Sequence, residues 1–255
     1  MLECCRMSEE TLIIPFRFRG PPSSGNGGYV GGAISELLDA DAPVEVTLRA
    51  PVPLDTALEV QRGDGIRVVR GETLIAEAHA ADLADLELRV PEPPSYEEAK
   101  AAQPNSPSFF KGINPLVPGG EGFHPVCFCC GTENPDGMHV YAAPVEEGGQ
   151  VVAAWPTEAR WGDADGRLPE RLLWTALDCP GQFAYLTNGI RTGMLGRITA
   201  QVKRSAPAGE RYVVTGWCIE VERKKHFAGT AVFDCDGELI AIAKSVWIGD
   251  MGRTP

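Results

Sequence analysis

Two short stretches of this 255-residue chain have residue types and spacings suited to chemistry. The first, SSGNGGYVGGAISELL, covers residues 23–38 and places glycines at the start of a segment whose apolar residues have helical spacing. Glycine inside a helix costs about 1 kcal/mol relative to alanine, so the cluster needs a reason. The first N–H groups of a helix are unpaired and partially positive. Without Cβ atoms, Gly27 and Gly28 would let a substrate oxygen reach these donors as it becomes negative.

The structural alternative for the same glycines is close packing of the helix against a sheet. We assign Gly31 and Gly32 to that packing, which leaves Gly27 and Gly28 for chemistry. The two explanations concern successive turns of one helix. They predict different neighbours for each glycine.

The second stretch contains His124, Cys127, Cys130 and His139, spaced H-x2-C-x2-C-x8-H. A C-x2-C pair on a turn suits zinc, and two histidines would complete a tetrahedron. The alternative is a tight turn without metal, since ENPDG at 133–137 supplies proline and glycine. We favour the turn. For the unpaired Cys179 we expect a small buried hydrophobe rather than a nucleophile.

A net charge of −12 argues against binding to nucleic acid. Two groups of basic residues in the last third of the chain could nevertheless bind an anionic small molecule: Lys203 and Arg204, and Arg223, Lys224 and Lys225. The competing interpretation is a strand edge that is kept soluble by its charge. No apolar run approaches the length of a membrane span, and eight cysteines without scaffold spacing favour free or metal-bound thiols, so we expect a cytoplasmic protein.

The elements that must position these residues are repeated along the chain. Residues 91–122 have the proline- and glycine-rich composition of a linker, and they separate a first unit at 7–90 from a second at 123–250. Each unit reads as one helix followed by several strands. Shifting the chain by 154 positions aligns VEVTL at 44–48 with ITAQV at 198–202. The sequence therefore predicts an internal duplication.

This order of elements predicts an α+β fold with an antiparallel sheet. A parallel doubly wound sheet needs a helix between successive strands, and here the strands follow one another directly. Dinucleotide binding is excluded on spacing, because Val30 stands where G-x-G-x-x-G counted from Gly25 requires glycine. An antiparallel sheet packed on its helices fits the pattern.

Several motifs resemble the double hotdog-fold family of acyl-CoA thioesterases and thioesterase-like proteins. NGGYVGGAIS at 26–35 resembles the start of the hotdog helix, and ALDCPGQFAYL at 176–186 resembles its middle. CFCCGTENPDGMHV at 127–140 resembles the C-F-x-C-G...N-P-x-G-L segment of a thioesterase-like group. The resemblance implies a tandem hotdog, in which one long antiparallel sheet wraps two central helices.

The same resemblance implies one catalytic site built from both units. Asp178 falls where the family has its general base or nucleophile, and Gly27 and Gly28, led by Asn26, would hold the thioester oxygen. The reverse site, which would use Glu36, is expected to be inactive because Pro169 and Glu170 replace the glycines there. Hydrolysis of acyl-CoA follows, with coenzyme A as part of the substrate and no other cofactor.

Alternatives remain at this stage. Pro180 should break the helix, and Asp178 could then merely cap the restarted part. The protein would in that case be a hotdog module that binds acyl-CoA or another hydrophobic ligand without cleaving it. An enoyl-thioester hydratase is disfavoured because no histidine lies between His139 and His226. Acyl chain, carrier and homo-oligomeric state stay open.

Overall fold

The computed structural model describes residues 10–38, 40, 42–110, 123–145 and 150–253. Residues 7–9 of the predicted first unit and 111–122 of the predicted linker lie outside the described residues. The helices and strands, in chain order, are β1 Thr11–Leu12, α1 Gly27–Ser35, β2 Val44–Leu48, β3 Leu58–Arg62, β4 Ile66–Arg70, β5 Thr73–Ala80, α2 Tyr96–Ala102, β6 Ala143–Pro144, β7 Gln150–Pro156, α3 Glu170–Ala176, α4 Cys179–Leu186, β8 Ile190–Val202, β9 Arg211–Glu222, β10 Lys225–Phe233 and β11 Leu239–Arg253.

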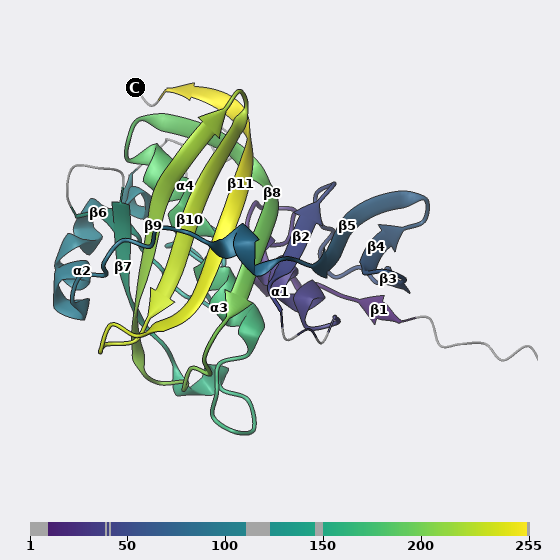
Figure 1. Ribbon diagram of the computed structural model, residues 1–255, viewed down its shortest axis with the longest axis horizontal. Coiled ribbons are helices and arrows are strands. Elements are labelled where there is room, and N and C mark those ends of the chain that lie inside the picture. Colours follow the sequence, from purple (N-terminus) through teal and green to yellow (C-terminus); the bar gives the residue numbers. More distant parts are fainter. Residues whose placement is uncertain (1–9, 39, 41, 111–122, 146–149, 254–255) are drawn as a thin grey trace, which may run out of the picture.

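The strands form a single antiparallel sheet in the order β1-β3-β4-β5-β2-β8-β11-β10-β9-β7-β6 (Figure 1). Strands β2 and β8 pair at its middle, where Val44 lies opposite Ala200 and Val46 opposite Ile198. Read outward from this pair, the order is β2-β5-β4-β3-β1 on one side and β8-β11-β10-β9-β7-β6 on the other. The first five strands of each run correspond in their order of pairing, and β6 is an addition at the edge of the second run. A parallel doubly wound sheet is therefore excluded, as predicted.

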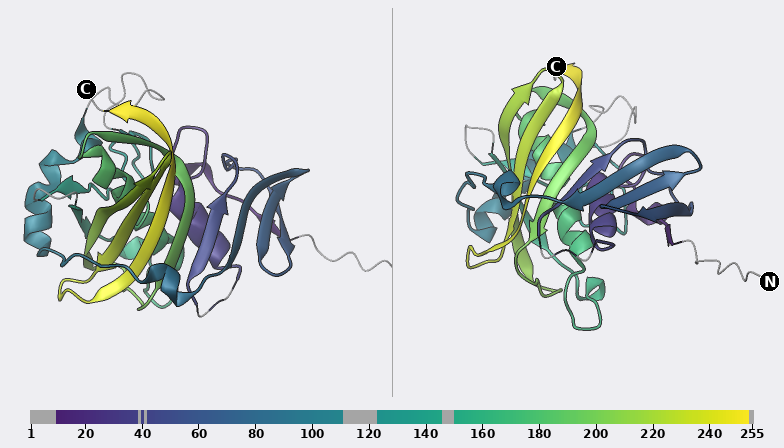
Figure 2. Two further views of the ribbon diagram at one scale, coloured as in Figure 1. Left: turned by 45° about the horizontal axis from the view of Figure 1, so that its top comes forward. Right: turned by 45° about the vertical axis from the view of Figure 1, so that its right-hand side comes forward.

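Helices α1, α3 and α4 lie on the concave face of this sheet, as the two views of Figure 2 show. Helix α1 contacts β2 and α3, while α4 contacts β7, β8, β9 and β10. The side chains of β7 alternate between the two faces of the sheet, and both faces are covered there. Val151, Ala153 and Trp155 point into the main core, whereas Val152 and Ala154 point outward against α2. The outer face of the second half is thus covered as well.

The proline-rich segment after β5 contributes to that cover. It runs across the outer face of β9 and β10, where Leu88 and Val90 pack against Trp217 and Phe233 (Figure 1). Helix α2 then begins at a capping box in which Ser95 and Glu98 satisfy each other's backbone N–H groups. The proposed domain boundaries stay a prediction. None of the described helices is both long and apolar enough to cross a membrane.

Candidate active site

Asp178 lies between α3 and α4, with its carboxyl group against the first turn of α1. Its side chain is 3% exposed, and its Oδ2 atom accepts hydrogen bonds from Asn26 Nδ2 at 2.6 Å and from the Gly28 N–H at 3.1 Å. The other carboxyl oxygen, Oδ1, is buried and has no hydrogen-bond partner among the described residues. The carboxyl group is thus held through Oδ2.

The sequence breaks the helix at this point for a covalent reason. Pro180 has no N–H to donate, so α3 ends at Ala176 and α4 begins at Cys179 with Pro180 in its first turn. Asp178 takes the N-cap position of α4, yet its side chain makes no capping hydrogen bond there. The expected break is confirmed. The alternative in which the Asp178 side chain caps α4 is wrong, because Asn26 and Gly28 take its carboxylate instead.

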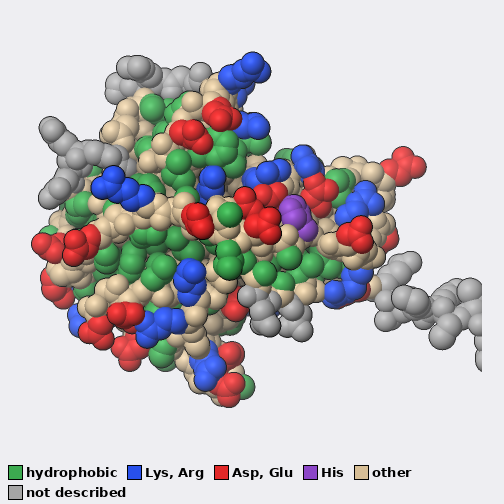
Figure 3. All heavy atoms as spheres, viewed as in Figure 1, with side chains coloured by type: hydrophobic (Ala, Val, Ile, Leu, Met, Phe, Trp, Pro, Cys, Tyr) green, Lys and Arg blue, Asp and Glu red, His purple; other side chains and the backbone are tan. Residues whose placement is uncertain are grey.

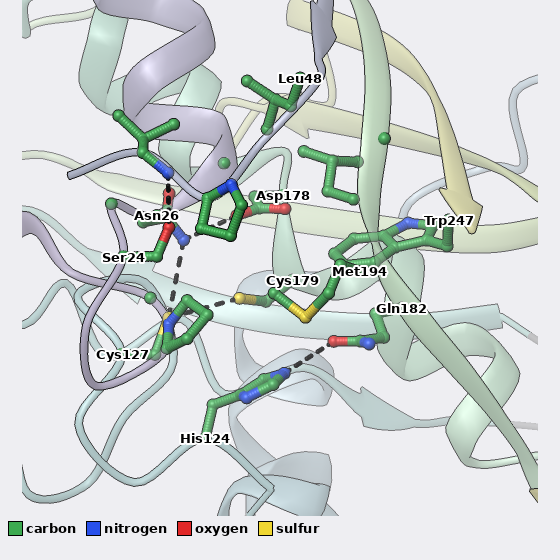
Figure 4. Close-up of a pocket in the computed structure, with 18 of the residues that line it drawn as sticks. Ser24, Asn26, Leu48, His124, Cys127, Asp178, Cys179, Gln182, Met194 and Trp247 are labelled. Carbon is green, nitrogen blue, oxygen red and sulfur yellow. Dashed lines mark hydrogen bonds between the residues drawn. The ribbon is translucent and has the colours of Figure 1, made fainter. Parts of the chain in front are cut away.

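Asn26 joins the start of α1 to the carboxyl group. As N-cap residue of α1 it accepts a hydrogen bond from the Tyr29 N–H through Oδ1 at 2.9 Å. Its Nδ2 atom is then directed at Asp178 (Figure 4). One amide group therefore fixes both the helix terminus and the acid, although the two residues are 152 positions apart in the chain.

The glycines of α1 divide between packing and pocket. A Cβ atom on Gly28 would lie 2.4 Å from the Trp174 carbonyl oxygen, and one on Gly32 would lie 2.5 Å from the Arg171 Cα. A Cβ on Gly31 would lie 3.0 Å from the Trp174 ring. A Cβ on Gly27 would lie 2.6 Å from Leu195 Cδ2 in the pocket wall and 3.4 Å from Leu48 Cδ1. Close packing thus explains Gly28 as well as Gly31 and Gly32, beyond what the sequence predicted, whereas Gly27 contacts side chains of the pocket wall.

The Gly28 N–H, expected as a donor to the substrate, donates to Asp178 in this structure. The neighbouring Gly27 N–H also lowers the pKa of this carboxyl group, by less than Gly28 and Asn26 do. The partially positive N-terminus of α1 therefore interacts with the Asp178 carboxyl group in this structure. Any substrate oxygen that binds here must share these donors with the acid.

Burial controls the protonation of Asp178. Removal of the carboxyl group from water and the proximity of Cys127 raise the pKa of Asp178 to about 7, against the opposing hydrogen bonds from Gly28, Asn26 and Gly27. A carboxyl group with a pKa near neutrality is present in both protonation states. It can therefore accept a proton and return it.

A pocket of about 500 Å³ opens in front of Asp178. Residues from both halves of the chain border it, including Asn26 and Gly27 from one and Asp178, Cys179 and Gln182 from the other. Most of its wall is apolar, formed by Leu48, Val52, Met194, Leu195, Trp247 and Ile248 (Figure 4). The combination of an apolar wall and a few polar groups at one end is typical of small-molecule sites.

Gln182 and His124 form a polar edge of this pocket that the sequence reasoning missed. Gln182 donates from Nε2 to the Gly193 carbonyl at 2.9 Å and to Thr192 Oγ1 at 3.1 Å. These bonds direct its Oε1 atom toward His124 Nε2, 2.8 Å away. The signal available in the sequence was the helical spacing, since Gln182 lies one turn after Asp178.

The predicted zinc ligands do not come together. His139 Nε2 lies 3.1 Å from the Asn134 carbonyl oxygen, and its ring stacks on Tyr141, away from the thiols. Among the described residues, Cys127 and Cys130 are instead grouped with Cys179, and neither histidine belongs to that group. The alternative in which His124, Cys127, Cys130 and His139 together bind zinc is therefore wrong. His139 adopts a positive φ of 57°, and this backbone conformation turns its side chain away from the other residues of the predicted ligand set.

The five predicted basic residues lie at two ends of the sheet. Lys203 and Arg204 follow the end of β8 and hydrogen bond to Gln201 and Glu238. At roughly 3.3 Å per residue, Lys203 lies about 26 Å along the strand from Leu195 in the pocket wall. None of the five lines the pocket.

Arg223 and Lys224 form the β9–β10 turn at the other end of the sheet, and Lys225 begins β10, where it pairs with Ile248 of the pocket rim. On the face in Figure 3, Lys and Arg side chains are interspersed with Asp and Glu. Arg49, which was not predicted, does line the pocket and is paired with Glu77. The predicted basic cluster is thus two separate groups.

The reverse site, in which Glu36 would take the place of Asp178, has its carboxylate engaged by an arginine. Glu36, at the end of α1, accepts hydrogen bonds from the Arg171 backbone N–H at 3.2 Å and from its Nε at 3.0 Å. Its carboxylate is therefore engaged in an ion pair with Arg171 at the first turn of α3. This arrangement mirrors Asp178 at the first turn of α1. Here an arginine side chain holds the carboxylate, whereas Asp178 is held by Asn26 and the Gly28 N–H.

Comparison with known proteins supports the fold. No family model and no curated protein matches the sequence. A structure provisionally described as a thioesterase, from Novosphingobium aromaticivorans, matches with a TM-score of 0.59 at 11% identity, covering 94% of each chain. Another, provisionally a thioesterase II from Thermobifida fusca, matches with a TM-score of 0.56 at 13% identity over 96% of this chain and 97% of its own.

A further structure, a thioesterase superfamily protein, is 19% identical with a TM-score of 0.46. That match spans 50% of this chain and 62% of the other protein, which is less than two thirds of its length. The two full-length matches show that this chain shares the fold of thioesterase-superfamily structures. The hotdog fold expected from the sequence motifs is thereby confirmed.

Proposed function

We propose that this protein hydrolyses acyl thioesters of coenzyme A, with Asp178 as the base that activates water. The observation that carries the proposal is the state of its two carboxyl oxygens. Oδ2 is held by Asn26 and Gly28, while the buried Oδ1 has no partner among the described residues and the side chain borders the pocket. A buried polar atom without a partner is costly, so a site for a water molecule or a substrate is the reason that we infer.

The reaction follows from this arrangement. A water molecule bound at Oδ1 loses a proton to the carboxylate as its oxygen attacks the thioester carbonyl carbon. The resulting tetrahedral intermediate collapses with cleavage of the C–S bond, and Asp178 returns the proton to the leaving thiolate. The products are a carboxylic acid and free coenzyme A. General-base assistance of this kind is worth roughly 10² to 10⁴ in rate.

The oxyanion would form beside the first turn of α1. Gly27 presents no Cβ atom to the pocket, and its neighbour Gly28 already directs an N–H group to this spot. We propose that the thioester oxygen shares these donors with Asp178. One such donor typically contributes about 3–4 kcal/mol to the transition state.

The acyl and nucleotide portions of the substrate have different candidate sites. The apolar wall that includes Leu48, Leu195 and Trp247 suits an acyl chain. Of the predicted basic residues, we retain residues 223–225 for the phosphates of coenzyme A, because Lys225 pairs with the rim residue Ile248. Lys203 and Arg204 lie at the far end of β8 and are dropped from the proposal.

We also propose that the fold is a tandem double hotdog, with units at 7–90 and 123–250. The support is the matching order of β2-β5-β4-β3-β1 and β8-β11-β10-β9-β7 around the central pair, with one helical element on the concave side of each run. The reciprocal contacts of Asp178 with α1 and Glu36 with α3 fit a pseudo-twofold relation. One site per chain has the pocket, and in the other Arg171 holds the Glu36 carboxylate.

The first test is thiol release from acyl-CoAs of graded chain length. Wild-type protein should turn over at least one of them, and Asp178→Asn should lower kcat by about 10² or more without unfolding. Glu36→Gln is the matched control, since it changes a carboxylate at the corresponding helix and should leave turnover unchanged.

Binding without turnover by the wild type would contradict hydrolysis and support the ligand-binding module. Addition of water to an enoyl-CoA, with no thiol released, would instead indicate the hydratase. Both alternatives share the fold, so the choice depends on chemistry at Asp178 and not on further structural comparison.

A further inference from the structure

Three buried thiols from two distant parts of the chain meet beside the pocket. The Sγ atoms of Cys127, Cys130 and Cys179 all lie within 4.8 Å of one another, and those of Cys127 and Cys179 are 3.7 Å apart. A disulfide has its sulfurs at about 2.05 Å, so these are separate thiols, and all three are free. Hydrolysis as proposed above uses none of them.

We infer that Cys127, Cys130 and Cys179 bind one thiophilic metal ion, of which Zn²⁺ is the biological choice that best suits three thiolates. The spacing agrees with this. Two sulfurs bound to one tetrahedral zinc at about 2.3 Å lie about 3.8 Å apart, which matches the 3.7 Å between Cys127 and Cys179. Ordinary packing of buried thiols imposes no such convergence of three side chains.

The loop that carries two of the thiols has a backbone suited to metal binding. Residues 127–131 read C-F-C-C-G, and the Gly131 N–H donates to the Cys127 carbonyl at 2.8 Å. A Cβ atom at Gly131 would lie 2.5 Å from the Cys127 nitrogen and 2.5 Å from the Pro125 carbonyl oxygen, so only glycine fits. The turn thereby places Cys127 and Cys130 on one side of a compact loop.

The third thiol comes from the first residue of α4. Cys179 is held there by the break at Asp178 and by Pro180, so its direction is fixed by the same backbone that positions the acid. A helix N-terminus favours a thiolate, and Asn26 Nδ2 lies 3.6 Å from the Cys127 sulfur as a further donor. Cys127 and Cys179 both border the pocket, which gives an ion a path to the site.

The consequence is a metal clamp next to the proposed base. An ion bound by Cys179 would tie the loop at 127–131 to the residue that follows Asp178. It would thus fix the α3–α4 junction against this loop. This role does not depend on which reaction the pocket performs, and the inference stands even if hydrolysis does not.

The experiment measures metal binding directly. Reduced, chelator-treated protein is titrated with Zn²⁺ and, separately, with Co²⁺, whose thiolate charge-transfer absorption reports sulfur ligands. We expect one ion per chain, a Co²⁺ spectrum of tetrahedral thiolate coordination, and a higher Tm with Zn²⁺. Absence of stoichiometric binding to the reduced wild type would overturn the inference, as would a Co²⁺ spectrum without thiolate bands.

Variants test the ligand set. Cys179→Ser should abolish the Co²⁺ thiolate bands, whereas Cys218→Ser, outside the cluster, should keep them. Cys129→Ser tests the boundary of the set, because the buried Cys129 thiol contacts Cys179 but is not one of the three grouped thiols. Binding that survives in Cys179→Ser, or is lost in Cys129→Ser, would contradict this ligand set. The wild-type spectrum tests the inference even if a variant does not fold.

Discussion

Replacement of Asn26 by alanine should lower stability and disturb the site, because its side chain both caps α1 and hydrogen bonds to Asp178. It removes the cap on the Tyr29 N–H, worth about 1 kcal/mol, and the 2.6 Å bond to Asp178. A hydrogen bond to a charged group contributes about 1.5–3 kcal/mol, so the free energy of unfolding should fall by roughly 2.5–4 kcal/mol. Asn26→Ser keeps a capping oxygen and should lose only the larger of these two contributions.

A double-mutant cycle isolates the bond between the two side chains. Unfolding by denaturant is measured for wild type, Asn26→Ala, Asp178→Ala and the double variant, above the Asp178 pKa of about 7, where the carboxylate is ionised. We expect a coupling energy of about 1.5–3 kcal/mol. Additivity within about 0.5 kcal/mol would refute the reasoning, since it would mean that the contact contributes nothing to stability.

Four further substitutions test the packing of the fold and of the site, one of them as a control. Gly32→Ala should lower the free energy of unfolding by about 1–2 kcal/mol, because its Cβ would lie 2.5 Å from the backbone of α3 and the helix-propensity gain offsets only part of the overpacking. Gly63→Ala, where a Cβ meets nothing within 4 Å, should change stability by less than about 0.5 kcal/mol in the same denaturant assay. Gly27→Ala should impair thiol release more than stability, because its Cβ would lie 2.6 Å from the end of the Leu195 side chain and would displace this part of the pocket wall; unchanged kinetics would contradict an oxygen site there. Tyr185→Phe should cost about 1–2 kcal/mol in thermal unfolding, as its hydroxyl hydrogen bonds to the carbonyls of two strands at 2.6 and 2.7 Å; a Tm equal to that of wild type would show that this contact is dispensable.

Local patterns predicted much of the architecture. The order of one helix and several strands in each half, and the break at Pro180, depend on interactions within a few residues: backbone hydrogen bonding, alternation of apolar side chains and the missing proline N–H. These are present in the sequence itself. The sequence predicted close packing for Gly31 and Gly32 of α1, but it missed the packing of Gly28 and did not predict that Gly28 and Gly32 meet the backbone of α3.

Contacts between distant segments needed the tertiary structure. The spacing of His124, Cys127, Cys130 and His139 suggested one ligand set, yet a turn with a positive φ sends His139 elsewhere, and Cys179 arrives from another helix. Residue spacing constrains directions only within a turn or two of the chain. Beyond that, the meeting of side chains is decided by strand register and helix packing.

The amino-acid sequence by itself thus determined the elements, the glycine-led start of α1 and, through resemblance, the choice of Asp178. Only the tertiary structure decided that Asn26 links that acid to the helix, that three thiols converge beside it, and that the basic residues separate to opposite ends of the sheet. The physical reason is the same in each case. Period and propensity are properties of neighbouring residues, whereas a site is a distance between segments set by the packing of the whole sheet on its helices.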